Sequence, residues 1–169
     1  MGGSVMVRWI LVFVLAGWLG GGCQEQRMEH HADDAAPIAD QGPAYVVRPI
    51  GKVAMRDGRT FIEIEPRYEA GLRGLERHSY VDVVWWFDKN DTPRGRSVLE
   101  VHPRGDRTLP LTGVFATHSP FRPNLIGITR CDIVGIEGAV IEVREIDAFD
   151  GTPVLDLKGD FFRFYQKPE

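Results

Sequence analysis

Three short polar segments interrupt runs of apolar residues, at Val101–Gly105, His118–Asn124 and Asp147–Pro153. The middle segment reads HSPFRPN, and it is longer than a connection between two strands requires, since two residues such as Asn-Gly suffice. Arg122 can bind a carboxylate through two parallel hydrogen bonds, and Asn124 offers both a donor and an acceptor. These residue types predict a ligand-binding loop.

The same residues also allow a purely structural interpretation. In it, Arg122 caps a helix end or pairs with Asp150, and Asp150 forms an Asx turn onto the backbone near Thr152. In the functional interpretation, Asp150 holds Arg122 or orients a ligand amine. Pro120 and Pro123 stiffen the loop, which reduces the entropy lost when a ligand is held. Arg122 and Asp150 are therefore candidate catalytic groups, with both interpretations open.

The elements that must position these segments are strands. Thr60–Glu65, Ser79–Asp88 and Ala139–Val143 alternate apolar and polar residues, as half-buried strands do. Ala70–Arg77 predicts one short helical turn, and a break in the alternation predicts a bulge near Arg144 and Glu145. Further short runs rich in β-branched residues are Ser97–Val101, Leu111–Thr117 and Leu125–Gly135. The pattern predicts an all-β, mainly antiparallel domain that closes into a single barrel.

Composition agrees with one soluble-type domain. The chain has 169 residues, 43% of them hydrophobic and 26% charged, and a formal net charge of −4. A large basic surface for nucleic acid is therefore not expected. Cysteine and histidine do not recur at zinc-binding spacings, so no metal site is predicted. Cys131 lies among Ile128, Ile133 and Val134 and is expected to be a small core residue.

The N-terminal residues are typical of an export signal. One arginine, Arg8, precedes the apolar stretch WILVFVLAGWL, and Gly20–Gly22 leads into Cys23. We predict a signal peptide over residues 1–22, a lipidated Cys23 with a polar tether over residues 23–44, and the barrel over residues 45–169. The protein is then an exported lipoprotein, anchored to a bacterial membrane on its periplasmic side. The alternatives are an uncleaved anchor, or a mis-assigned start upstream of a cytoplasmic protein.

Four segments together resemble the TsaA-like (TrmO-type) family. They read PIGKV at 49–53, GLRGLE at 71–76, GVFATHSPFRPNLIG at 113–127 and DAFDGTPVLDLK at 147–158. The resemblance covers 110 residues, Pro49 to Lys158, with the motifs in the family's order. It implies a β-barrel that works as a homodimer. It also implies an S-adenosyl-L-methionine-dependent methyltransferase, whose type member acts on threonylcarbamoyladenosine in tRNA.

The resemblance also implies which residues bind the cofactor: Phe87, His118, Arg122, Pro123, Asn124, Glu145, Ile146 and Asp147. Two positions depart from the family pattern. His118 stands where the loop usually has arginine, and Asp88 stands where a histidine usually follows the strand. The first change removes a bidentate guanidinium, and the second introduces a negative charge.

Two functions from different classes follow. The first is methyl transfer from S-adenosyl-L-methionine to an acceptor that the sequence does not identify. The second is a non-catalytic lipoprotein that uses the barrel to bind a small ligand or a protein partner. Export favours the second, because an exported protein does not meet tRNA. Nucleic acid is then not an expected partner.

Overall fold

The alternating segments form strands whose apolar sides face a common interior. The computed structural model describes residues 42–160. In β2 (Arg59–Ile64) Ile62 and Ile64 are buried, and in β3 (Tyr80–Trp86) every second residue from Val81 to Trp85 is buried. The period of two thus places one face of each strand in the core, as the sequence predicts.

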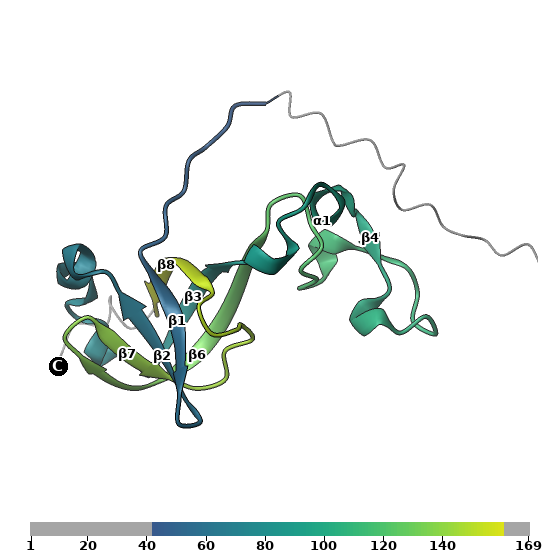
Figure 1. Cartoon of the computed structure of the whole chain (residues 1–169). Coiled ribbons are helices and arrows are strands. Elements are labelled where there is room, and N and C mark those ends of the chain that lie inside the picture. Colours follow the sequence, from purple (N-terminus) through teal and green to yellow (C-terminus); the bar gives the residue numbers. More distant parts are fainter. Residues whose placement is uncertain (1–41, 161–169) are drawn as a thin grey trace, which may run out of the picture. The chain divides into compact units, whose positions relative to one another are not determined.

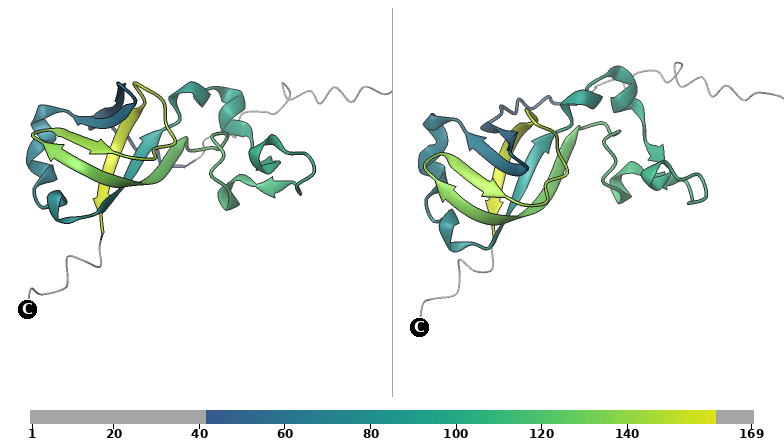
Figure 2. Two further views of the ribbon diagram at one scale, coloured as in Figure 1. Left: turned by 90° about the horizontal axis from the view of Figure 1, so that it is seen from below. Right: turned by 60° about the horizontal axis from the view of Figure 1, so that its bottom comes forward.

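Six strands close into one antiparallel barrel, in the order β1-β2-β7-β6-β3-β8. Figure 1 labels the strands, and Figure 2 shows them wrapping around the same interior from two further directions. The prediction of a single all-β barrel is confirmed. The remaining barrel strands are β1 (Gly51–Arg56), β6 (Ile126–Glu137), β7 (Val140–Val143) and β8 (Pro153–Gly159).

The barrel closes along a short seam between β1 and β8. The strands pair at Gly51 with Val154 and at Lys52 with Pro153. Three backbone hydrogen bonds extend this seam: Ile50 N–H to the Val154 carbonyl at 2.8 Å, Val53 N–H to the Thr152 carbonyl at 2.9 Å, and Gly151 N–H to the Val53 carbonyl at 2.9 Å. The turn before β8 therefore takes part in closing the barrel.

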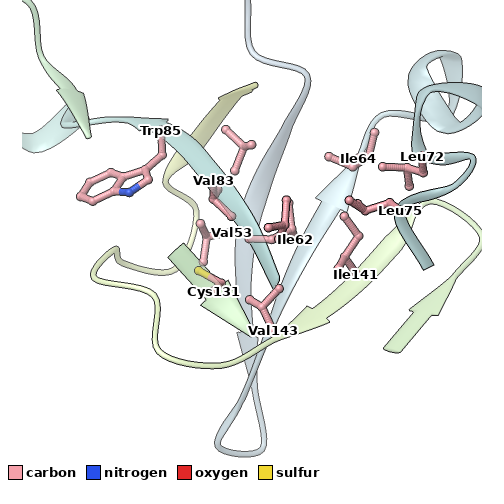
Figure 3. Close-up of a cluster of buried hydrophobic side chains, with 12 residues drawn as sticks. Val53, Ile62, Ile64, Leu72, Leu75, Val83, Trp85, Cys131, Ile141 and Val143 are labelled. Atoms are coloured by element: carbon pink, nitrogen blue, oxygen red, sulfur yellow. The ribbon is translucent and has the colours of Figure 1, made fainter. Parts of the chain in front are cut away.

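The core consists of aliphatic side chains with Trp85 at one end of the cluster (Figure 3). Cys131 is fully buried within it, which confirms its expected role as a core residue. Trp85 fits because Gly127 stands opposite it on β6: a Cβ there would lie 2.6 Å from the Trp85 ring. Such a distance is shorter than a van der Waals contact allows, so this position requires glycine.

Short helices fill the connections. The predicted turn at Ala70–Arg77 falls on two 3₁₀ helices, η1 (Pro66–Leu72) and η2 (Leu75–Arg77). Three more 3₁₀ helices lie between β3 and β6: η3 (Asp88–Asn90), η4 (Pro103–Gly105) and η5 (Val114–Ala116). The same connection contains one α-helix that the sequence pattern did not predict, α1 (Pro93–Ser97).

The β3–β6 connection, residues 87–125, carries a small sheet of its own (Figure 1). In it, β4 (Glu100–Val101) pairs with β5 (Thr112–Gly113). The runs predicted at Ser97–Val101 and Leu111–Thr117 therefore contain strands, but each strand is two residues long. The second run continues as η5, not as a strand.

The predicted bulge near Arg144 and Glu145 is wrong. β7 ends at Val143, and Glu145 adopts a left-handed conformation with φ of 61°. The register shift lies on the neighbouring strand instead, between Ile133 and Gly135 of β6. Both features interrupt the alternation, so the sequence pattern alone did not distinguish a bulge from a strand end.

Several predictions concern residues outside 42–160. They are the signal peptide, the lipidated Cys23 and most of the tether. Within residues 42–160, no helix is long and apolar enough to span a membrane.

We expect Glu145→Gly to stabilise the fold. A left-handed residue other than glycine costs roughly 1–2 kcal/mol, and glycine removes this cost at some expense in chain entropy. The Glu145 side chain makes no hydrogen bond or ion pair within the described residues, so little is lost with it. The free energy of unfolding in urea should rise by about 1 kcal/mol.

Glu137→Gly is the matched control, because Glu137 is an exposed glutamate within β6. It should lower the free energy of unfolding by roughly 0.5–1 kcal/mol. A loss of stability in both variants would show that the Glu145 backbone is not strained.

Candidate functional site

One cavity of about 880 Å³ lies beside Asn124 of the predicted binding loop and Pro153, the first residue of β8. Asn124 of the loop and Pro153 after the turn both line it, with Trp86, Ile126 and Leu155. Its remaining wall is the segment Pro43–Pro49, which precedes β1 and supplies Pro43, Ala44, Tyr45, Val46, Val47 and Pro49. A cavity of this size and largely apolar lining suits a small-molecule ligand. We call it the site cavity.

Arg122 does not extend towards Asp150. Its Nη2 donates to the carbonyls of Val114 and Thr117, at 2.6 Å and 2.9 Å, and its Nη1 lies 3.5 Å from the Ile126 carbonyl. Val114 begins η5 and Thr117 follows it, so Arg122 caps this short helix. The structural interpretation of Arg122 is thus the one that the contacts support, and the guanidinium holds its own loop in shape.

Asp150 is also bound to the backbone. Its Oδ1 accepts a hydrogen bond from the Met55 N–H of β1 at 2.8 Å. The Asx turn onto Thr152, one of the two interpretations left open, is not formed. Thr152 bonds Phe149 twice instead: its N–H donates to the Phe149 carbonyl, and its hydroxyl accepts from the Phe149 N–H. The two candidate catalytic groups therefore contact different parts of the barrel and not each other.

The other predicted cofactor residues differ in their surroundings. Phe87 packs edge-on against Trp85, with ring centres 4.4 Å apart, and Ile146 packs against the core. His118, Glu145 and Asp147 are exposed. Asn124 is the predicted residue that the cavity lining includes, and its carbonyl accepts from the Ile126 N–H at 2.7 Å.

A clamp that the sequence reading missed holds the loop against β3. Arg96 Nε donates to Asp91 Oδ1 at 2.8 Å, and its Nη1 donates to the Pro123 carbonyl at 3.1 Å. Trp86 Nε1 donates to Asp91 Oδ2 at 3.2 Å, and the Arg96 guanidinium lies 5.3 Å from the Trp86 ring centre. The clamp thereby joins two walls of the site cavity, Trp86 and the loop beside Asn124.

The clamp also favours the charged form of the Asp91 carboxylate. The hydrogen bond from Arg96 lowers the pKa of Asp91 below its ordinary value, with a smaller contribution from Trp86.

The sequence does contain one signal for α1, the helix that carries Arg96. Thr92 and Pro93 are typical N-cap and first-turn residues, and Thr92 Oγ1 accepts from the Gly95 N–H at 3.0 Å. The five-residue α1 was too short for periodicity to reveal.

Tyr80, Trp86 and Phe149 are each covered by a cation of the chain itself. Arg130 lies 4.2 Å from the Tyr80 ring centre, Arg96 covers Trp86, and Lys89 lies 4.0 Å from the Phe149 ring centre. Phe149 is 63% exposed, so its ring lies on the surface and not in the core.

Other reactive chemistry is limited in the described region. Within residues 42–160, no group of three His, Cys, Asp or Glu side chains could hold a metal ion. Burial raises the pKa of Cys131 to about 12, so its thiol is neutral at physiological pH and is not an activated nucleophile. The site therefore offers shape, aromatic surface and amide groups for holding a ligand.

Comparison with known proteins agrees with this barrel and its loops. The sequence model of the tRNA-methyltransferase O N-terminal domain matches residues 46–164. A probable S-adenosyl-L-methionine-binding protein of Methanocaldococcus jannaschii is 44% identical over 114 residues, covering 68% of this chain and 90% of the relative. A protein of the same description from Pyrococcus horikoshii is also 44% identical, covering 68% and 82%.

A mouse tRNA (adenine(37)-N6)-methyltransferase is 38% identical over 101 residues, which cover 60% of this chain and 22% of the mouse protein. The crystal structure of TrmO from Pseudomonas aeruginosa superposes with a TM-score of 0.53 at 27% identity, and the match covers 74% of this chain. The chain spans 60% of the length of that structure. The match over residues 46–164 shows that this chain belongs to the tRNA-methyltransferase O N-terminal domain family.

Proposed function

We propose that this chain binds S-adenosyl-L-methionine in the site cavity and transfers its methyl group to a nitrogen nucleophile. The observation that carries the proposal is the cavity itself, which both Asn124 of the HSPFRPN loop and Pro153 at the start of β8 line. The archaeal relatives described as binding this cofactor support it. The mouse relative methylates adenine 37 of tRNA, but the acceptor of this chain is left open.

The residues present fit a cofactor that needs positioning more than acid–base chemistry. When bound, the cofactor would supply an activated methyl group on sulfur. Asn124 would hold a polar edge of it, while Trp86, Ile126 and Leu155 would surround its apolar parts. Arg122 and the Asp91–Arg96 clamp would act indirectly, by fixing the loop that carries Asn124. Correct placement of two reactants is itself a large source of rate enhancement.

His118 and Asp88 are the departures that bear on cofactor affinity. Both side chains are exposed, and neither makes a hydrogen bond or ion pair within residues 42–160, so both can be changed without disturbing the fold. We expect calorimetry to show weak binding of S-adenosyl-L-methionine by the natural chain. The double variant His118→Arg, Asp88→His should bind about ten- to a hundredfold more tightly, because one charge-assisted hydrogen bond contributes roughly 1.5–3 kcal/mol.

The single change Glu100→Lys serves as a control, because it shifts the net charge of the β3–β6 connection by +2, as the double variant does, at an exposed side chain outside the cavity lining. It should leave affinity unchanged. Equal and tight binding by the natural chain and the double variant would show that the departures do not limit affinity. Absence of binding in both would contradict the proposed cofactor.

A second candidate function is non-catalytic ligand binding by an exported lipoprotein. The specific observation in its favour is that Arg122 and Asp150, the candidate catalytic groups, are both committed to backbone hydrogen bonds. The two functions differ in one measurable respect. Cofactor binding without methyl transfer to any nucleoside or tRNA acceptor would favour the second.

We propose that the chain is exported and lipidated on Cys23, because a basic start, an apolar stretch and small residues precede this cysteine. Cys23→Ser should release the protein from the membrane fraction or leave it as a larger precursor. Fractionation followed by immunoblotting measures both. A mature protein of unchanged size and location in the variant would contradict lipidation.

We propose that the barrel forms a homodimer, as the family resemblance implies. Exposed leucines of the β3–β6 connection, Leu99, Leu109 and Leu111, offer apolar surface for a second copy. Sedimentation velocity should give about twice the chain mass of 19.0 kDa. A single species at the chain mass, at micromolar concentration, would contradict the dimer.

A further inference from the structure

The wall of the site cavity that precedes β1 lies at the edge of the family match. The segment Pro43–Pro49, which we call the strap, has no helix or strand, and its end is fixed where the Ile50 N–H donates to the Val154 carbonyl at 2.8 Å. The family match begins at residue 46, so Tyr45 lies just outside it. The matched family segment therefore implies no role for Tyr45.

Tyr45 presents an uncovered aromatic face beside the cavity. Tyr45 is one of the residues that line the cavity, and it is 86% exposed. Trp86, the other aromatic residue of the lining, already has Arg96 over its ring. Within residues 42–160, no ring or cation of the chain lies against Tyr45, in contrast to Tyr80 and Phe149.

An aromatic face of this kind attracts two chemical groups that the proposed ligand contains. A sulfonium cation is drawn to the negative face of the ring, and a purine stacks on it. The neighbouring strap residues Val46 and Val47 add apolar surface along the same wall. Ordering an exposed side chain over a ligand costs little when the side chain is an aromatic one with two rotatable bonds.

We propose that Tyr45 contacts the bound ligand through its ring face and is a determinant of ligand affinity. The proposal rests on the function proposed above, since it takes S-adenosyl-L-methionine as the ligand. It assigns a binding role to the segment that joins the barrel to the N-terminal tether.

The test is calorimetry on the full chain with S-adenosyl-L-methionine and, separately, with S-adenosylhomocysteine, which lacks the sulfonium charge. Tyr45→Leu keeps apolar surface but loses the ring face, and it should weaken binding about three- to thirtyfold. Tyr45→Phe keeps the ring and should bind like the natural chain. Phe115→Ala removes an aromatic side chain that is 80% exposed outside the cavity lining, and it should have no effect.

The two ligands identify which group faces the ring. A larger loss for S-adenosyl-L-methionine than for S-adenosylhomocysteine places the sulfonium there, and an equal loss places the purine there. Unchanged affinity of Tyr45→Leu for both ligands would overturn the role of Tyr45 while leaving the proposed function intact. Failure of the natural chain to bind either ligand would overturn the proposed function and this inference together.

Proteolysis gives an independent readout. Chymotrypsin cleaves after exposed aromatic residues, and saturating S-adenosyl-L-methionine should slow cleavage of the Tyr45–Val46 bond several-fold. The Phe115–Ala116 bond is the internal control and should be cleaved at the same rate with and without the ligand. Equal cleavage after Tyr45 in both conditions, with the ligand bound, would contradict the contact.

Discussion

The closing seam between β1 and β8 is the constraint on which the site depends. Regular pairing across it covers two residue pairs, and the adjoining turn supplies much of the remaining hydrogen bonding. Asp150 strengthens the seam through its bond to the Met55 N–H, and Gly151 donates to the Val53 carbonyl. The main structural role of the turn before β8 is therefore to close the barrel. Its position beside the site cavity follows from that closure, since Pro153 and Leu155 continue directly from it.

The HSPFRPN loop, which lines the cavity at Asn124, is also held in shape by hydrogen bonds to its backbone. Arg122 satisfies carbonyl groups at the end of η5, and Arg96 satisfies the carbonyl of Pro123. Charged side chains thus stabilise irregular backbone that no regular strand or helix could support, which is the ordinary requirement for buried or half-buried carbonyls. The loop can then present Asn124 in a fixed place. A site built in this way favours holding a ligand over acid–base catalysis.

The alternation of apolar and polar residues predicted the strands that have one buried face. The alternating segments that contain β2, β3 and β7 were found because each strand has one buried face, and closure of the barrel followed from the need to avoid open edges. The strand end at Glu145 was mistaken for a bulge, because both interrupt the same alternation. The five-residue α1 is shorter than any window in which a helical period is visible.

The site was less predictable for a different reason. Of the binding residues that the motif resemblance implies, Asn124 lines the site cavity. What each charged side chain does was not predictable, because Arg122, Asp150 and Arg96 bond backbone atoms whose proximity only the folded chain creates. The strap was not predictable as a wall for the same reason, since it has no strand pattern and shares a cavity with Trp86 only in the folded chain.

Cys131 has a consequence for the compartments in which the folded barrel can persist. Disulfide exchange proceeds through the thiolate, and the pKa of about 12 that burial gives Cys131 leaves almost none of that form at neutral pH. Its full burial also denies access to oxidants. The folded barrel is thereby indifferent to the redox potential around it. The same core can serve in a reducing cytoplasm or an oxidising periplasm, without a change at this position.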